Sequence, residues 1–183
     1  MLMDTFLRLA EREHAALTAM DQTAGDGDFG DNLCGALRLV VERVPAGATP
    51  STELAVAATC FLDEVGGTSG PLIGLLLQEM AAAPTLVQGL TDGIAAIQRV
   101  GEAKLGDRTM LDSLIPARDH LAAHPDDLAG AAAAAERAAE STKDLRARAG
   151  RASYVGDRAL GTPDAGATGM ALFLAALAEA GAR

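Results

Sequence analysis

The sequence predicts an all-α protein in which about eight helices form an antiparallel bundle. Three observations support this fold class. Hydrophobic residues make up 49% of the 183 residues but aromatic residues only 3%, so alanine and leucine supply most of the apolar content and favour helices over strands. Apolar residues recur at helical spacing along most of the chain, and no segment alternates as a strand does. The length suits a single domain, residues 1–183.

The first three predicted helices each have a recognisable boundary. Residues 3–20 carry Leu, Phe and Met at helical spacing and should deliver Asp21 at their C-terminal end. Residues 33–44 carry Leu and Val on one face and end before a proline–glycine turn. Residues 51–65 follow Thr49 and Pro50, which are typical of a helix start.

Five more helices complete the prediction. Residues 72–80 form an apolar helix after a glycine-rich stretch, and further helices run from about 86 to 103 and from about 109 to 123. An alanine-rich helix extends from residues 125–127 to about 147, and its initial proline and two acids suit a helix N-terminus. The last helix covers residues 167–180.

Four connections have an unusual composition, and they follow the first, third, fifth and seventh helices. They are residues 21–32, 66–71, 106–108 and 150–166. In a bundle whose helices alternate up and down, these connections lie at the same end. The sequence therefore predicts one composite site at that end.

The first of these connections, residues 21–32, reads DQTAGDGDFGDN. It places four carboxylates within eleven positions, separated by glycines that permit a tight turn. Adjacent carboxylates repel one another unless a cation offsets their charge, and Mg²⁺ prefers oxygen ligands. The alternative is a solvated acidic turn without a metal. An EF-hand is excluded because Asp31 and Leu37 occupy its sixth and twelfth positions, where Gly and Glu are required.

Two other connections offer groups that bind phosphate. Residues 66–70 (GGTSG) combine small residues with hydroxyls, so their backbone N–H groups can approach an anion closely. Arg151 follows Gly150 and suits a two-point contact with phosphate oxygens. The ordinary alternatives are a helix–helix turn and a surface ion pair. Neither Lys104 nor Lys143 follows a Walker A pattern.

The overall charge and the cysteines exclude several other classes of protein. The net charge of −10 makes nucleic acid and anionic membranes poor partners. Cys34 and Cys60 form no metal or redox motif. Charged residues interrupt the N-terminal apolar positions, and the apolar segment 165–178 is too short to span a bilayer. We therefore expect a cytoplasmic protein.

Five ordered blocks resemble one family, the L subunit of dihydroxyacetone kinase and the equivalent nucleotide domain of single-chain kinases. Residues 20–32 (MDQTAGDGDFGDN) match its acidic signature. Residues 67–72, 106–114, 150–154 and 164–167 are similar to its later motifs, in the same order. The resemblance covers essentially the whole chain.

This resemblance implies an eight-helix antiparallel barrel that holds ADP or ATP and one or two Mg²⁺ ions at one end. It implies that Asp21, Asp26 and Asp28 bind the metal and act in catalysis together with Arg151. The resemblance also implies nucleotide contacts from several of the blocks: Asn32, Gly67, Thr68, Ser69, Gly106, Thr109, Met110, Arg151, Asp164 and Gly166.

The resemblance further implies two partners. A separate K-type subunit would hold dihydroxyacetone or a related small ketose, and a phosphotransferase-system M-type protein is a possible phosphoryl donor. Two departures affect the site: Phe29 removes a polar phosphate contact that many members have, and Asp31 adds negative charge. They leave a second interpretation open, a nucleotide-loaded regulatory or binding protein of the same fold without transfer activity.

Overall fold

The computed structural model describes residues 1–181, which contain nine α-helices, three short 3₁₀ helices and no strand. The all-α prediction is therefore confirmed for this part of the chain. The α-helices are α1 (Leu2–Arg12), α2 (His14–Ala24), α3 (Phe29–Arg43), α4 (Pro50–Glu64), α5 (Ser69–Ala82), α6 (Leu86–Gly101), α7 (Leu111–Ala123), α8 (Leu128–Ser141) and α9 (Ala165–Gly181). The 3₁₀ helices are η1 (Thr142–Asp144), η2 (Arg151–Tyr154) and η3 (Gly156–Ala159).

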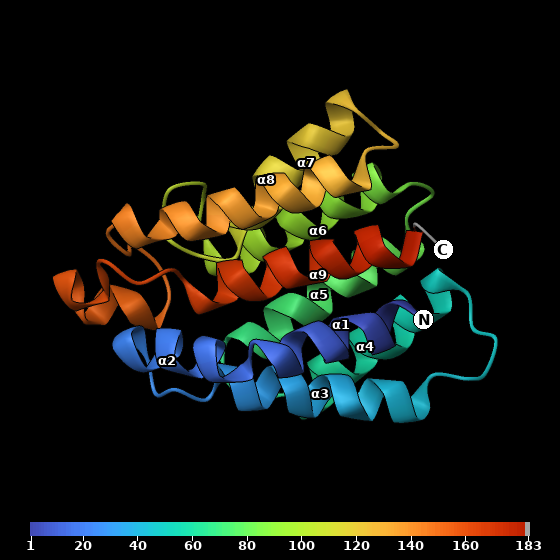
Figure 1. Cartoon of the computed structure of the whole chain (residues 1–183), viewed down its shortest axis with the longest axis horizontal. Coiled ribbons are helices and arrows are strands. Elements are labelled where there is room, and N and C mark those ends of the chain that lie inside the picture. The colour runs from blue at the N-terminus through green and yellow to red at the C-terminus, as the bar shows by residue number, and fades with distance from the viewer. Residues whose placement is uncertain (182–183) are drawn as a thin grey trace.

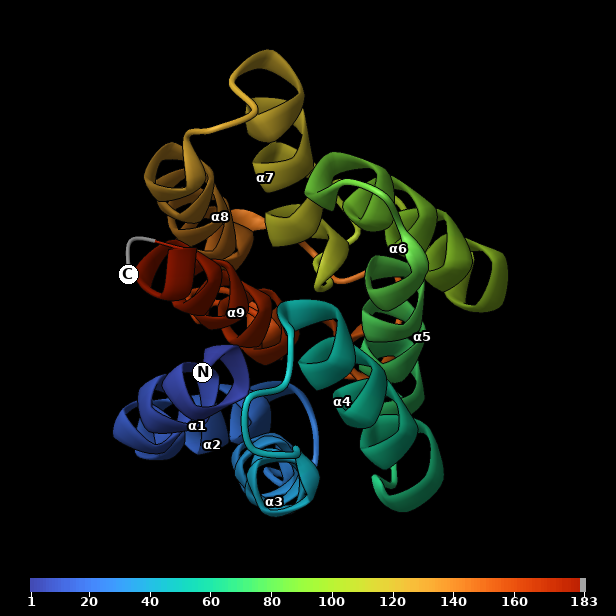
Figure 2. The same cartoon turned by 90° about the vertical axis from the view of Figure 1, so that its right-hand side faces the viewer.

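The α-helices form a closed ring around one apolar core. Helices that follow one another from α3 to α9 pack side by side, and α1 lies between α9 and α3 and so closes the ring. Figure 2 looks along this barrel, and Figure 1 shows its long side. Leucine, alanine and phenylalanine side chains from these helices fill the interior. The barrel implied by the resemblance is thus present.

The prediction of one helix over residues 3–20 is wrong in one respect. The helix is interrupted at Glu13, and α2 then continues beyond Asp21 to Ala24. The interruption lets α2 lie against the start of α3. A Cβ atom on Gly30 would lie 2.5 Å from the Thr18 hydroxyl and 3.0 Å from the His14 carbonyl oxygen.

The helix around residues 125–147 is shorter than predicted, because α8 ends at Ser141. The buried Thr142 explains this end. Its hydroxyl donates to the Ala139 carbonyl at 2.5 Å and accepts the N–H of Asp164 at 2.8 Å. The chain is thereby directed towards the start of α9. Conversely, α5 begins at Ser69, three residues before the predicted start, and the connection from 150 to 166 contains two 3₁₀ helices.

Within the described residues, no helix has both the length and the apolar character needed to cross a membrane.

Candidate functional site

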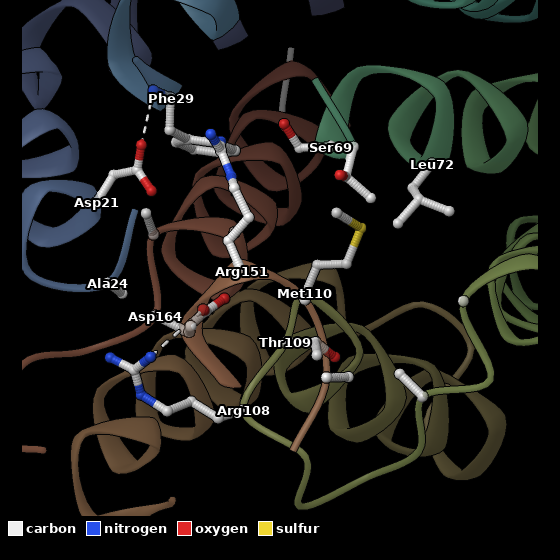
Figure 3. A pocket seen from close by; sticks show the side chains of 18 of the residues that line it. Asp21, Ala24, Phe29, Ser69, Leu72, Arg108, Thr109, Met110, Arg151 and Asp164 are labelled. Carbon is white, nitrogen blue, oxygen red and sulfur yellow. Dashed lines mark hydrogen bonds and ion pairs between the residues drawn. The ribbon is translucent and has the colours of Figure 1, made fainter. Parts of the chain in front are cut away.

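The four unusual connections converge on one pocket of about 220 Å³ at one end of the barrel. Figure 3 shows this pocket from close by, with side chains entering it from several helix ends. Eight of the residues predicted for the site line it: Asp21, Thr68, Ser69, Thr109, Met110, Arg151, Asp164 and Gly166. The structure therefore brings the four connections together at one pocket, as their order in the chain predicts.

Asp21, Asp26 and Asp28 form a compact group at the pocket, which we call the acidic triad. One carboxylate oxygen from each lies within 4.8 Å of the others. Asp21 projects from α2, and its Oδ2 accepts the N–H of Phe29 at 3.2 Å. Asp28 is the residue immediately before α3. The donor set consists only of carboxylate oxygens, which fits Mg²⁺ or another hard divalent cation.

Arg151 is the counter-charge of the acidic triad within the protein. Its guanidinium pairs with Asp26 and, at 3.3 Å, with Asp28. Burial works against ionisation of Asp26, but a hydrogen bond with Asp28 and the charge of Arg151 outweigh it and lower the pKa of Asp26. Burial likewise opposes the charge of Arg151, but Asp28 and Asp26 outweigh it and raise its pKa.

The start of α5 faces the same pocket with two hydroxyl side chains. Thr68 precedes the helix and Ser69 is its first residue, and the Thr68 side chain makes no capping hydrogen bond. Gly70 lets the preceding chain fold closely over this end, because a Cβ atom there would lie 2.7 Å from the Val65 carbonyl oxygen. Free N–H groups and the helix dipole make such an end suitable for a phosphate group.

On the opposite side of the pocket, Asp164 caps α9. Its Oδ2 accepts the N–H of Ala167 at 2.8 Å. Burial raises the pKa of Asp164 from 3.8 to about 6; the hydrogen bond from Ala167 and the charge of Arg108 only partly offset this effect. The pKa of Asp164 thus places the change in its protonation near pH 6.

Arg108 is a site residue that the sequence analysis missed. Its side chain is fully buried, and its Nη1 lies 4.0 Å from Oδ1 of Asp164. Its Nη2 donates to the carbonyls of Ala159 and Thr162 at 3.0 and 2.9 Å, so it ties the 106–110 connection to the chain before α9. Figure 3 shows this guanidinium beside Asp164. Its position inside the GDRTML block was the available signal.

Asp112 is a second missed residue, and it shapes the same connection. Its two buried carboxylate oxygens accept the N–H groups of Gly106 at 2.6 Å and Thr109 at 2.7 Å. Gly106 itself has a positive φ of 92°. The backbone N–H of Gly106 is therefore used within the protein, and this residue does not line the pocket.

An apolar wall completes the pocket, and the sequence analysis did not assign most of its residues to the site. It includes Leu72, Ile97 and Ala103 beside the predicted Met110. Helical spacing cannot separate side chains that face a pocket from those that face the core, so only the fold identifies them. Aliphatic side chains beside hydroxyl and carboxyl groups suit a ligand with an aromatic base and polar substituents.

Some predicted site residues lie elsewhere. Asn32 and Gly67 are not part of the pocket lining, and neither are Asp26 and Asp28, which reach the site only through the acidic triad. Asp31, expected to add negative charge to the site, is 77% exposed in its side chain and pairs with His14 at 2.8 Å.

The DAK2 domain family matches residues 23–179. The chain is 36% identical to the ADP-binding subunit DhaL of the PEP-dependent dihydroxyacetone kinase of Escherichia coli, over 92% of this chain and 89% of that protein. It is 37% identical to L-erythrulose 1-kinase of Mycolicibacterium smegmatis, over 97% of this chain but only 34% of that protein.

Solved structures agree with the sequence comparison. The dihydroxyacetone kinase of C. freundii superposes in its native form with a TM-score of 0.80 and 29% identity, over 98% of this chain and 33% of that one. The same kinase in complex with AMP-PNP and Mg²⁺ gives a TM-score of 0.77 at 28% identity, with the same coverage. The chain spans about a third of the length of these larger relatives.

Proposed function

Because the chain belongs to the DAK2 domain family, we propose that it is the nucleotide-binding subunit of a kinase that phosphorylates dihydroxyacetone or a related small ketose. The observation that carries this proposal is the acidic triad at the rim of a pocket lined by the start of α5, Arg151 and Asp164. These parts supply the two requirements of phosphoryl transfer, charge neutralisation and alignment.

Each part has a distinct task in this proposal. The acidic triad would hold one or two Mg²⁺ ions, which when bound polarise and neutralise the terminal phosphates of ATP or ADP. Thr68 and Ser69 at the start of α5 would hold phosphate oxygens, and Arg151 would stabilise the charge that develops on the transferred group. Met110 and Leu72 would pack on the base of the nucleotide. Asp164 would form a hydrogen bond with its sugar.

The ketose would be held by a second, K-type subunit. Among residues 1–181, no histidine lines the pocket: His14 pairs with Asp31, and His120 pairs with Asp127. Exposed large apolar side chains are concentrated near the pocket instead. Four of these side chains lie within one to four positions in the sequence of a residue that lines the pocket: Val100, Leu105, Tyr154 and Leu160. Such a rim suits a protein partner.

Two questions of mechanism stay within this proposal. The nucleotide is either an exchanging ATP or a retained ADP that an M-type protein rephosphorylates, and the DhaL relative is named for ADP binding in a PEP-dependent kinase. The competing function is a nucleotide-loaded regulatory protein without transfer activity, for which Phe29 is the remaining argument.

The decisive experiment combines the purified chain with a K-type subunit, Mg²⁺, ATP or PEP-linked donors, and dihydroxyacetone. We expect only trace product from the chain alone and clear transfer with the partner. An Asp28→Asn variant should lose nucleotide retention and transfer while its helical content is unchanged, because a ligand carboxylate is removed outside the core. Wild-type retention by this variant contradicts the metal assignment; bound nucleotide without transfer favours the regulatory function.

A further inference from the structure

Phe29 is the first residue of α3 and follows directly after Asp28 of the acidic triad. Its side chain is 6% exposed and belongs to the main apolar core, although the turn that precedes it is polar. The ring also lines the pocket beside the acidic triad, but the function proposed above gives it no role.

The ring is inserted against α9 at Gly169. A Cβ atom on Gly169 would lie 2.8 Å from Cζ and 3.0 Å from Cε1 of Phe29, so any other residue at this position would collide with the ring. Figure 2 shows α1 and α2 between α3 and α9. Phe29 therefore connects the start of α3 to a helix that is not its neighbour in the ring.

Two further contacts fix the same turn. The backbone N–H of Phe29 donates to Oδ2 of Asp21 at 3.2 Å, which links the ring position to the acidic triad. Gly30 lies against α2, where a Cβ atom would meet the Thr18 hydroxyl at 2.5 Å. The turn that carries Asp26 and Asp28 is thus held between α2 on one side and α9 on the other.

We infer that Phe29 is a positioning residue for the acidic triad, and that Gly169 is the position on α9 that receives it. The ring would fix the position of the turn that carries Asp26 and Asp28 relative to α9. The position of these carboxylates in turn determines the affinity for a divalent cation. This inference rests on the proposed metal site. A carboxylate group positioned loosely by about 1 Å binds an ion with strict geometric demands less well.

Three variants test the contact between Phe29 and Gly169, and a fourth variant serves as the control. Phe29→Leu replaces the ring with a smaller side chain, and Phe29→Tyr adds a hydroxyl at Cζ, the ring atom nearest to Gly169. Gly169→Ala places a methyl group where the ring now packs against α9. The matched control is Phe6→Leu. Phe6 is also buried and packs on α9, with its ring centroid 5.4 Å from that of Phe173, one turn beyond Gly169.

Mn²⁺ affinity, measured by electron paramagnetic resonance without nucleotide, is the first readout. We expect a loss of about tenfold or more for the three variants, as is typical when the support of a metal ligand is removed. Phe6→Leu should lower the melting temperature about as much as Phe29→Leu does, because both remove part of a buried ring. It should leave Mn²⁺ affinity within about twofold of the unchanged chain. The pair Phe29→Leu with Gly169→Ala should bind more tightly than Gly169→Ala alone, because the smaller side chain leaves room.

Hydrogen exchange of residues 26–31 in metal-free protein is the second readout. Exchange should accelerate in Phe29→Leu and not in Phe6→Leu. Equal exchange and equal Mn²⁺ affinity in these two variants would overturn the inference. If the unchanged chain binds no Mn²⁺ at all, the proposed metal site fails, and the exchange data decide the role of Phe29 without it.

Discussion

Arg151 has two possible sets of partners, and one guanidinium group cannot contact both fully at the same time. It pairs with Asp26 and Asp28 of the acidic triad, and it also lines the pocket where phosphate is proposed to bind. A divalent cation bound as proposed would therefore compete with Arg151 for the same carboxylates. In the proposed function, a cation and a phosphate bound together would release the side chain from the carboxylates towards the phosphate.

This competition predicts opposite effects for an Arg151→Gln substitution. Without nucleotide, Mg²⁺ or Mn²⁺ should bind a few-fold more tightly, because a partly exposed ion pair worth about 1 kcal/mol or less no longer has to be broken. With nucleotide, affinity should fall, because a phosphate ligand is lost. Calorimetric titration of metal and of Mg-ADP measures both. Arg146→Gln removes another surface arginine, which is more exposed than Arg151 and pairs with Asp157, and serves as the charge-matched control.

If Arg151→Gln weakens metal binding as well as nucleotide binding, the competition is absent and Arg151 merely supports the turn.

Asp164 predicts a dependence of stability on pH. Its pKa in the folded protein is about 6, above the ordinary value of 3.8. Between these values the folded state holds a proton that the unfolded state has released, so this group's contribution to stability falls as pH rises from about 4 to about 6. The total loss is about 3 kcal/mol at most.

Replacing Asp164 with Asn should remove this slope, although above about pH 6, where Asp164 is ionised, it also takes the counter-charge from buried Arg108. Urea denaturation of both proteins at several pH values provides the comparison. The stability difference between wild type and variant should favour wild type most at about pH 4 and shrink towards pH 7. The exposed Asp63→Asn variant should show no such trend, and a pH-independent difference for Asp164→Asn would refute the assignment.

At the scale of elements, the connection from Gly150 to Asp164 carries both the counter-charge of the acidic triad and the most exposed aromatic residue. Tyr154 in η2 is 89% exposed and is not part of the pocket lining, whereas its neighbours Arg151 and Ala152 are. An exposed tyrosine beside the site is typical of a binding hot spot.

We therefore expect Tyr154→Ala to weaken binding of a K-type partner by about 2 kcal/mol, roughly thirtyfold, and to leave Mg-ADP affinity unchanged. Surface plasmon resonance against the immobilised partner, with parallel calorimetry for nucleotide, separates the two effects. Glu42→Ala lies on the exposed far end of α3 and should alter neither. Unchanged partner affinity would place the interface elsewhere.

The elements show which parts of the site a sequence can predict. The order of glycine-rich and acidic connections predicted that Asp21, Ser69 and Asp164 would meet, because an antiparallel bundle leaves little freedom in which ends are shared. Phe29 and Arg108 could not be interpreted in this way. One is an aromatic side chain in a polar turn and the other a charge in the core, and only the packing around Gly169 and the carbonyls of Ala159 and Thr162 explains them.

For the whole molecule, ligand binding should raise the stability of the fold. A ligand that binds only the folded state at a hundredfold excess over its Kd adds about 2.7 kcal/mol. For a chain of this size, Mg-ADP should therefore raise the melting temperature by about 5–10 °C, and EDTA should reverse the effect. Differential scanning fluorimetry on protein stripped of nucleotide measures the shift. No shift with any adenine nucleotide would remove the cofactor proposal.

The closure of the ring by its last helix determines when the site can exist during synthesis. Asp26 and Arg151 are 125 residues apart in the chain, and Arg8 pairs with Glu179 across 171 residues. A nascent chain emerging from the ribosome thus exposes the acidic triad before Arg151, its counter-charge within the protein, has been translated. Until α9 emerges, α1 and α8 expose the apolar faces that it will cover. Competence for nucleotide and completion of the fold therefore arrive together, once α9 has been translated.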